Sequence, residues 1–159
     1  MSLVQNLNKL EESDEFKEFI KNHPKAFLCA CFFLDGNWKI DYFCDEKITT
    51  FNLGSDIMVE ETNEILKGED KIRKLDVEKV DIEMDKAIEI ADGVLGKKYP
   101  NESANKKIVI LQNIKMKIVW NITYLTSGFN IFNIRIDTQN GDVVEEKLNP
   151  VASGFRFMS

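Results

Sequence analysis

The feature that most constrains the fold of this 159-residue chain is a short sequence pattern that occurs twice, in two segments about 80 residues apart. Residues 38–43 (WKIDYF) and 120–125 (WNITYL) carry Trp, Ile and Tyr at the same alternate positions. The period of two places the three side chains on one face of a β-strand. The sequence therefore predicts two tandem copies of one structural unit, with the two Trp-bearing strands in equivalent places.

Around each occurrence of this pattern, the expected elements follow the same order, a helix and then four short strands. In the first copy a helix is expected over 14–22, because Ser13 can cap its first turn. Strands are expected at 26–34, 38–42, 48–53 and 57–61. In the second copy an apolar stripe over 84–95 predicts the helix, and the Asn140-Gly141 pair predicts a hairpin. We expect an α+β fold in which each copy lays one helix on a four-stranded antiparallel sheet.

The two copies divide the chain near its middle. Residues 1–79 are expected to form the first copy, with a charged connector over about 62–79, and residues 80–159 the second. Strand 26–34 is apolar on both faces, which predicts that both are covered, by the other copy or by a second chain. Simple alternation puts Phe27 and Phe33 on one face and Phe32 on the other.

The second copy contains five features in a recognisable order. They are a helix at 82–91, a Trp-bearing strand at 119–124, a strand ending in an acid at 134–137, a turn with Gly141, and Val-Val-Glu at 143–145. This order resembles a PepSY domain over about residues 80–148, and the first copy resembles it through the repeat. PepSY domains are associated with propeptides of thermolysin-type peptidases and with modules that regulate peptidases. The resemblance implies a cystatin-like fold, a non-catalytic regulatory role and a peptidase partner.

Charge and composition exclude several classes of function. With 21 Lys and Arg against 27 Asp and Glu, the net charge is −6, which disfavours nucleic-acid and anionic membrane surfaces. The longest apolar run, 26–34, is too short to span a bilayer. The first residues lack a signal-peptide pattern, so we expect a cytoplasmic location, or an extracytoplasmic one if a signal segment had been removed.

The cysteines and the single histidine are the candidates for chemistry. Cys29 and Cys31 lie on one expected strand and Cys44 on the next, but they lack the spacing of a zinc site. We interpret them as small buried apolar residues, with a disulfide to Cys44 as an alternative. His23 lies at a helix end without an identifiable nucleophile, and a role in ending the helix is expected. No metal site and no cofactor are predicted.

The acidic pairs Glu60-Glu61 and Glu145-Glu146 occupy matching places in the two copies. Neighbouring residues on a strand point to opposite faces, so neither pair should form a paired-carboxylate site. Charged residues on outer strands deter unwanted strand pairing, and this role is expected for both pairs.

Four aromatic residues complete the list of candidates: Trp38, Tyr42, Trp120 and Tyr124. We expect them to form core under the helices, with a ligand groove as the alternative.

No catalytic residue is predicted, so the sequence favours a non-catalytic binding or regulatory module with a protein partner. The alternatives are a small-molecule binder or enzyme with a pocket between the copies, and a structural homo-oligomer such as a homodimer.

Overall fold

A computed structural model describes residues 2–62 and 72–153 of the chain. The chain divides into two compact units, residues 1–77 with 113–116, and residues 78–112 with 117–159. The fold is α+β, with three α-helices and eight strands of antiparallel sheet in the described residues. None of the helices in the described part of the chain combines the length and apolar character needed to cross a membrane.

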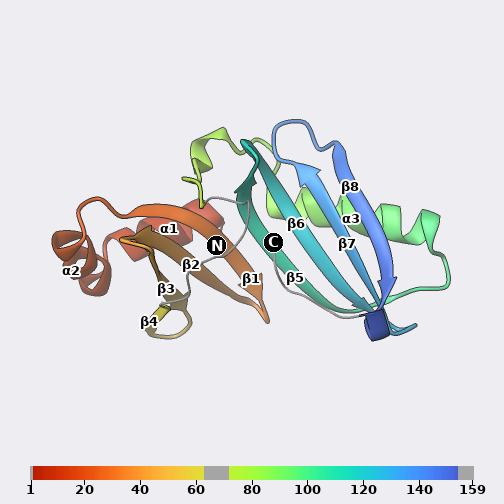
Figure 1. Ribbon diagram of the computed structural model, residues 1–159, viewed down its shortest axis with the longest axis horizontal. Helices are drawn as coiled ribbons and strands as arrows, with labels where there is room; N and C mark the ends of the chain where they lie inside the picture. The colour runs from red at the N-terminus through yellow and green to blue at the C-terminus, as the bar shows by residue number, and fades with distance from the viewer. Residues whose placement is uncertain (1, 63–71, 154–159) are drawn as a thin grey trace. The chain divides into compact units, whose positions relative to one another are not determined.

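The first unit contains two helices and four strands, whose order β4-β3-β2-β1 can be followed in Figure 1. Its elements are α1 (Leu3–Glu11), α2 (Asp14–Asn22), β1 (Phe27–Leu34), β2 (Asn37–Cys44), β3 (Lys47–Leu53) and β4 (Ile57–Thr62). The expected helix over 14–22 is confirmed, and the Ser13 hydroxyl accepts a hydrogen bond from the Phe16 amide at 3.2 Å. The expectation of one helix for this copy is wrong, because α1 precedes it.

The core of the first unit lies between α2 and one face of the sheet. The Phe16 ring centroid is 5.0 Å from that of Tyr42 and 5.7 Å from that of Phe51. Helix α1 contributes Leu7 and Leu10, both buried. Burying a large apolar side chain contributes about 1.5–3 kcal/mol, so these contacts fix the helices on this face.

A β-bulge in β1 changes the faces expected from simple alternation. Leu28 pairs with Tyr42 but Ala30 pairs with Asp41, so β1 carries one extra residue at this point. As a result Phe27 pairs with Phe43 on one face. Phe33 pairs with Trp38 on the other. The prediction that Phe27 and Phe33 share a face is wrong.

The burial of β1 is also narrower than its apolar sequence suggested. Cys29, Ala30 and Cys31 are buried, whereas Phe32 and Phe33 remain partly exposed. Phe27 and Leu28 at the start of the strand are partly exposed as well, so the expectation that both faces are dry along the whole strand is wrong at both of its ends. Next to the buried middle of the strand, the carbonyl of Leu28 accepts a hydrogen bond from the amide of the buried Leu75 at 2.8 Å.

The second unit contains one helix and four strands in the order β5-β6-β7-β8. Its elements are α3 (Met84–Lys98), β5 (Ala104–Ile114), β6 (Lys117–Thr126), β7 (Asn130–Asp137) and β8 (Val143–Pro150). Figure 1 shows α3 crossing one face of this sheet. The indole of Trp120 donates to the carbonyl of Ile82 at 2.7 Å, and the hydroxyl of Tyr124 donates to Asp92 of α3 at 2.5 Å.

Two connections differ from the expected ones. The expected hairpin at Asn140-Gly141 is confirmed, since β7 pairs with β8 across it, but its connection is longer than two residues. Only Gly141 has a positive φ (80°), and the Asp142 amide donates a hydrogen bond to the Asn140 side chain. Residues 63–71, half of the charged connector expected over 62–79, lie outside the described ranges. Its described end contains a short 3₁₀-helix, η1 (Val77–Lys79).

Candidate functional site

The four aromatic candidates lie in the cores of the two units. Trp38 and Tyr42 are 5% and 6% exposed, and Trp120 and Tyr124 are 1% and 0% exposed. Tyr42 packs against Phe16 of α2, and Trp38 lies on the same face of β2, where it packs against Phe33. The polar atoms of Trp120 and Tyr124 are satisfied by hydrogen bonds. Buried rings in this arrangement contribute packing, and they leave no aromatic surface for a ligand.

Cys29 and Cys31 are buried, as the sequence predicted, whereas the expectation that Cys44 is buried is wrong, because it is partly exposed at the end of its strand. All three are free thiols. Burial, with a smaller contribution from Asp41, raises the pKa of Cys29 to about 12, and burial likewise raises the pKa of Cys31. Thiols that stay protonated in the core are unreactive and do not ligate metals, as expected for small apolar residues.

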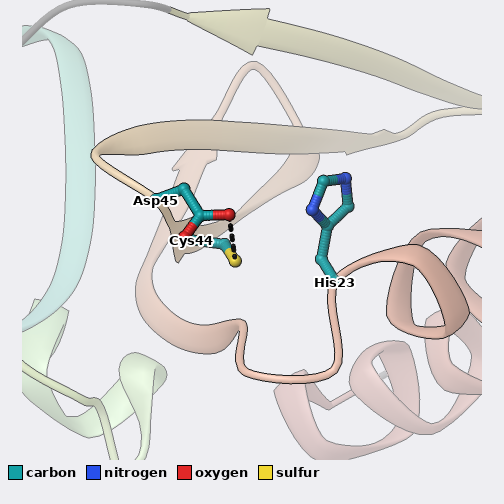
Figure 2. Close-up of side chains that lie close together, drawn as sticks. All are labelled: His23, Cys44 and Asp45. Carbon is teal, nitrogen blue, oxygen red and sulfur yellow. Dashed lines mark hydrogen bonds between the residues drawn. The ribbon is translucent and has the colours of Figure 1, made fainter.

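A cluster that the sequence did not predict brings Cys44 beside His23 and Asp45. One ligand atom from each side chain lies within 4.8 Å of the others, and all three residues belong to the first unit. Figure 2 shows the His23 imidazole facing the Cys44 and Asp45 side chains across a gap. The Cys44 thiol donates to Oδ2 of Asp45 at 3.6 Å. These three residues are called the His-Cys-Asp cluster below.

The end of helix α2 positions the histidine. The amide of His23 donates to the Phe19 carbonyl at 2.8 Å, and the carbonyl of His23 accepts from Ala26 at 3.0 Å. The imidazole also packs against the Phe19 ring at a centroid distance of 5.0 Å. The role in ending the helix expected for His23 is present in its backbone, which leaves the imidazole nitrogens for another partner.

The hairpin between β2 and β3 positions the other two side chains. Cys44 is the last residue of β2 and pairs with Lys47, the first residue of β3. Asp45 and Glu46 form the turn with φ of 53° and 64°, the left-handed region that non-glycine residues rarely adopt. Because β1 begins opposite Phe43, the chain that enters β1 from His23 passes beside this turn.

The electrostatics of the His-Cys-Asp cluster do not activate the thiol. Burial and the neighbouring Asp45 carboxylate raise the pKa of Cys44, against a smaller lowering by Lys25. A nucleophilic cysteine needs the opposite, a pKa lowered by a cationic or imidazole partner. The Cys44 thiol is hydrogen-bonded to the Asp45 carboxylate and not to the His23 imidazole, so the cluster lacks the cysteine–histidine pair of a catalytic dyad. It does bring together three side chains of the types that ligate metal ions.

The two acidic pairs lie on the outer strands β4 and β8, as the sequence predicted. In the second unit they point apart: Glu145 pairs with Arg135 of β7 at 3.2 Å, whereas Glu146 pairs with Lys98 of α3 at 2.6 Å. In the first unit Glu61 forms an exposed ion pair with Lys47 at 3.4 Å. Neither pair forms a site with two converging carboxylates.

Exposed apolar side chains occur on the same outer strands. Met58 and Val59 of β4 are 61% and 49% exposed, and Val143 and Val144 of β8 are 41% and 47% exposed. Among the described residues, β4 pairs with β3 and with no other strand. Its outer edge therefore presents backbone donors and acceptors beside apolar side chains.

A surface hollow of about 460 Å³ lies between α1 and the turn from β3 to β4 in the first unit. Lys9, Glu12, Glu15 and Asp56 are among the residues that line it. The hollow is open to solvent, and none of these charged residues is buried, so its lining lacks the converging buried polar groups of an enzyme pocket.

Comparison with known proteins informs the fold. No family model matches the chain, and no curated protein matches its sequence. The crystal structure of a "putative lipoprotein" from Clostridium difficile 630 is similar, with a TM-score of 0.58 and 16% identity. The match covers 88% of this chain and 97% of that chain. At this identity the likeness concerns the fold alone.

Proposed function

We propose that the protein is a non-catalytic binding module that engages an extended segment of a protein partner along the outer edge of β4. The observation that carries the proposal is the exposure of Met58 and Val59 on an edge strand. Neighbouring residues on a strand point to opposite faces, so an added strand would find an apolar contact on each face. Main-chain hydrogen bonds would supply affinity and these side chains specificity.

The charge on β4 defines the chemistry of the partner. Glu60 and Glu61 follow the two apolar residues, and the chain carries a net charge of −6. The ion pair between Glu61 and Lys47 is more than half exposed at both ends, so it is weak and exchanges readily with another cation. Met58 and Glu60 share one face of the strand, and Val59 and Glu61 share the other. A segment in which two adjacent apolar residues lie beside two adjacent basic residues therefore fits this edge.

The outer strand β8 is less suited to such a partner. Its acids are already engaged, Glu145 by Arg135 and Glu146 by both Lys98 and Tyr99. Lys147 and Pro150 follow on the same strand, and lysine and proline on an edge both deter strand addition. The partner is therefore assigned to β4, and β8 serves as a control surface.

The duplication and the PepSY relationship belong to the same proposal. In both units the Trp-Ile-Tyr motif lies on the second strand of four and faces the helix, which supports an origin by duplication. The PepSY resemblance of the sequence favours a peptidase as this partner. A location outside the cytoplasm would agree with the name of the structural neighbour.

A defined peptide tests the binding mode. An octapeptide of alternating valine pairs and lysine pairs is titrated into the protein by calorimetry, beside the same peptide with two prolines at its centre. We expect stoichiometric binding of the first peptide, weaker at high salt because exposed charges are screened within about 10 Å at 0.1 M. The proline-containing peptide should not bind, because proline cannot donate to a strand.

Matched variants locate the surface. Met58→Lys with Val59→Lys should weaken binding at least tenfold, whereas Val143→Lys with Val144→Lys on β8 should leave it unchanged. Equal binding of both peptides, or an equal loss in both double variants, would contradict the proposal. Peptide hydrolysis by the folded protein would favour the enzyme alternative, and a dimer that buries β4 would favour the homo-oligomer.

A further inference from the structure

We propose that the His-Cys-Asp cluster is a binding site for a divalent transition-metal ion of the zinc type. His23, Cys44 and Asp45 would supply three ligands, an imidazole nitrogen, a thiolate and a carboxylate oxygen. Three protein ligands leave one position of a tetrahedral ion for water or for a group of a partner. The site is independent of the β4 edge proposed above.

The distances in the cluster are close to those of a metal site. With bonds of about 2.3 Å to sulfur and about 2.1 Å to oxygen, a tetrahedral ion holds these two ligand atoms about 3.6 Å apart. The Cys44 sulfur and the Asp45 oxygen are 3.6 Å apart. The distances from the His23 nitrogen to these two atoms are at most 4.8 Å. A side-chain rotation that moves the nitrogen by about 1 Å would bring all three atoms to the spacing of a tetrahedral ion.

The scaffold around the cluster is fixed before any ion arrives. Two backbone hydrogen bonds and the Phe19 ring hold His23 at the end of α2. The paired strands β2 and β3 hold Cys44, and the two-residue turn between them holds Asp45. Binding then requires side-chain rotation only, which limits its entropic cost.

The ligand set selects the class of ion. Thiolate and imidazole favour Zn²⁺ and its neighbours, whereas Ca²⁺ and Mg²⁺ require several oxygen ligands that the cluster does not contain. As the metal–sulfur bond forms, the thiol proton leaves to solvent, so a thiolate and the Asp45 carboxylate together neutralise the two charges of the ion. The ammonium of Lys25, which acts electrostatically on Cys44, opposes the ion and limits its affinity.

Cobalt titration tests the site on the reduced full-length protein. Co²⁺ bound to a thiolate shows a near-ultraviolet charge-transfer band, and Zn²⁺ should displace it. We expect one Co²⁺ per chain and a rise in Tm with Zn²⁺, since an ion that binds only the folded state stabilises it. Mg²⁺ should produce neither effect.

Variants assign the ligands. Cys44→Ser should abolish the charge-transfer band although Cys29 and Cys31 remain, and His23→Gln or Asp45→Asn should weaken binding at least tenfold. Asp35→Asn is the matched control, because Asp35 occupies the same turn position between β1 and β2 with a φ of 52°. Circular dichroism and Tm without metal show whether each variant is folded.

Three results would overturn the proposal. One is the absence of a band in the folded wild-type protein. Another is a band that survives Cys44→Ser, which would place the ion on a different thiol. The third is an equal loss of affinity in Asp35→Asn and Asp45→Asn, which would show general electrostatic attraction in place of ligation.

Discussion

Replacing Asp41 with asparagine should stabilise the protein at neutral pH. Asp41 lies on β2, on the face of the sheet that points away from α2, and accepts a hydrogen bond from the Thr50 hydroxyl at 2.6 Å. Burial raises the pKa of this carboxyl to about 6, although Thr50 and Lys39 act to lower it. Folding therefore disfavours the charged form.

The size of the effect follows from the pKa. An unfolded aspartate has a pKa near 3.9, and each unit of difference corresponds to about 1.4 kcal/mol. A folded pKa of about 6 is raised, so the folded state binds more protons between pH 4 and 6 and stability falls as the pH rises through this window. Above pH 6 the full penalty, about 3 kcal/mol, is present. Asp41→Asn keeps an acceptor for Thr50 and removes this penalty, so we expect a gain of about 1–3 kcal/mol at pH 8.

Urea unfolding at one-unit steps from pH 4 to pH 8 measures this prediction. Relative to Asp41→Asn, the wild-type protein should lose stability as the pH rises from 4 to 6. The exposed turn variant Asp35→Asn should keep the wild-type pH dependence. An unchanged pH slope in Asp41→Asn, or a lower stability than wild type at pH 8, would refute the reasoning.

Two further pairs of variants test the packing. A Cβ at Gly128 would lie 2.6 Å from the Glu102 carboxylate, which accepts the Gly128 amide, so Gly128→Ala should lower Tm. Gly93→Ala, in open space on α3, should instead gain up to about 1 kcal/mol, and equal shifts in Tm would contradict this account. Phe51→Ala should cost about 3–5 kcal/mol and Phe32→Ala about 1–2 kcal/mol in urea unfolding, because only Phe51 is fully buried. Equal losses would show that Phe32 is covered.

The parts of the fold with a strong local pattern could be predicted from the sequence. Helix α2 and the strand alternation of Trp38, Ile40 and Tyr42 were expected, because capping and period-two burial act over a few residues. Helix α1 was missed although Ser2 and Gln5 form a capping box, because its apolar residues are few and scattered.

The bulge in β1 could not be predicted, because it depends on how two strands pair. One extra residue between Leu28 and Ala30 moves Phe27 to the other face, and no local signal marks it. The same pairing explains why the His-Cys-Asp cluster was missed. His23 and Cys44 are 21 positions apart, and only the register that places Phe27 opposite Phe43 brings them together.

Residue-resolved amide hydrogen exchange, with and without the lysine-valine octapeptide, tests the proposed function most directly. Strand addition gives the edge amides of β4 new hydrogen-bond partners, so their exchange should slow on binding. We expect the peptide to add protection against exchange at residues 57–62 and none on β8. In the double variant Met58→Lys with Val59→Lys, this added protection should be lost. Unchanged exchange along β4 at saturating peptide, or protection confined to another element, would contradict it.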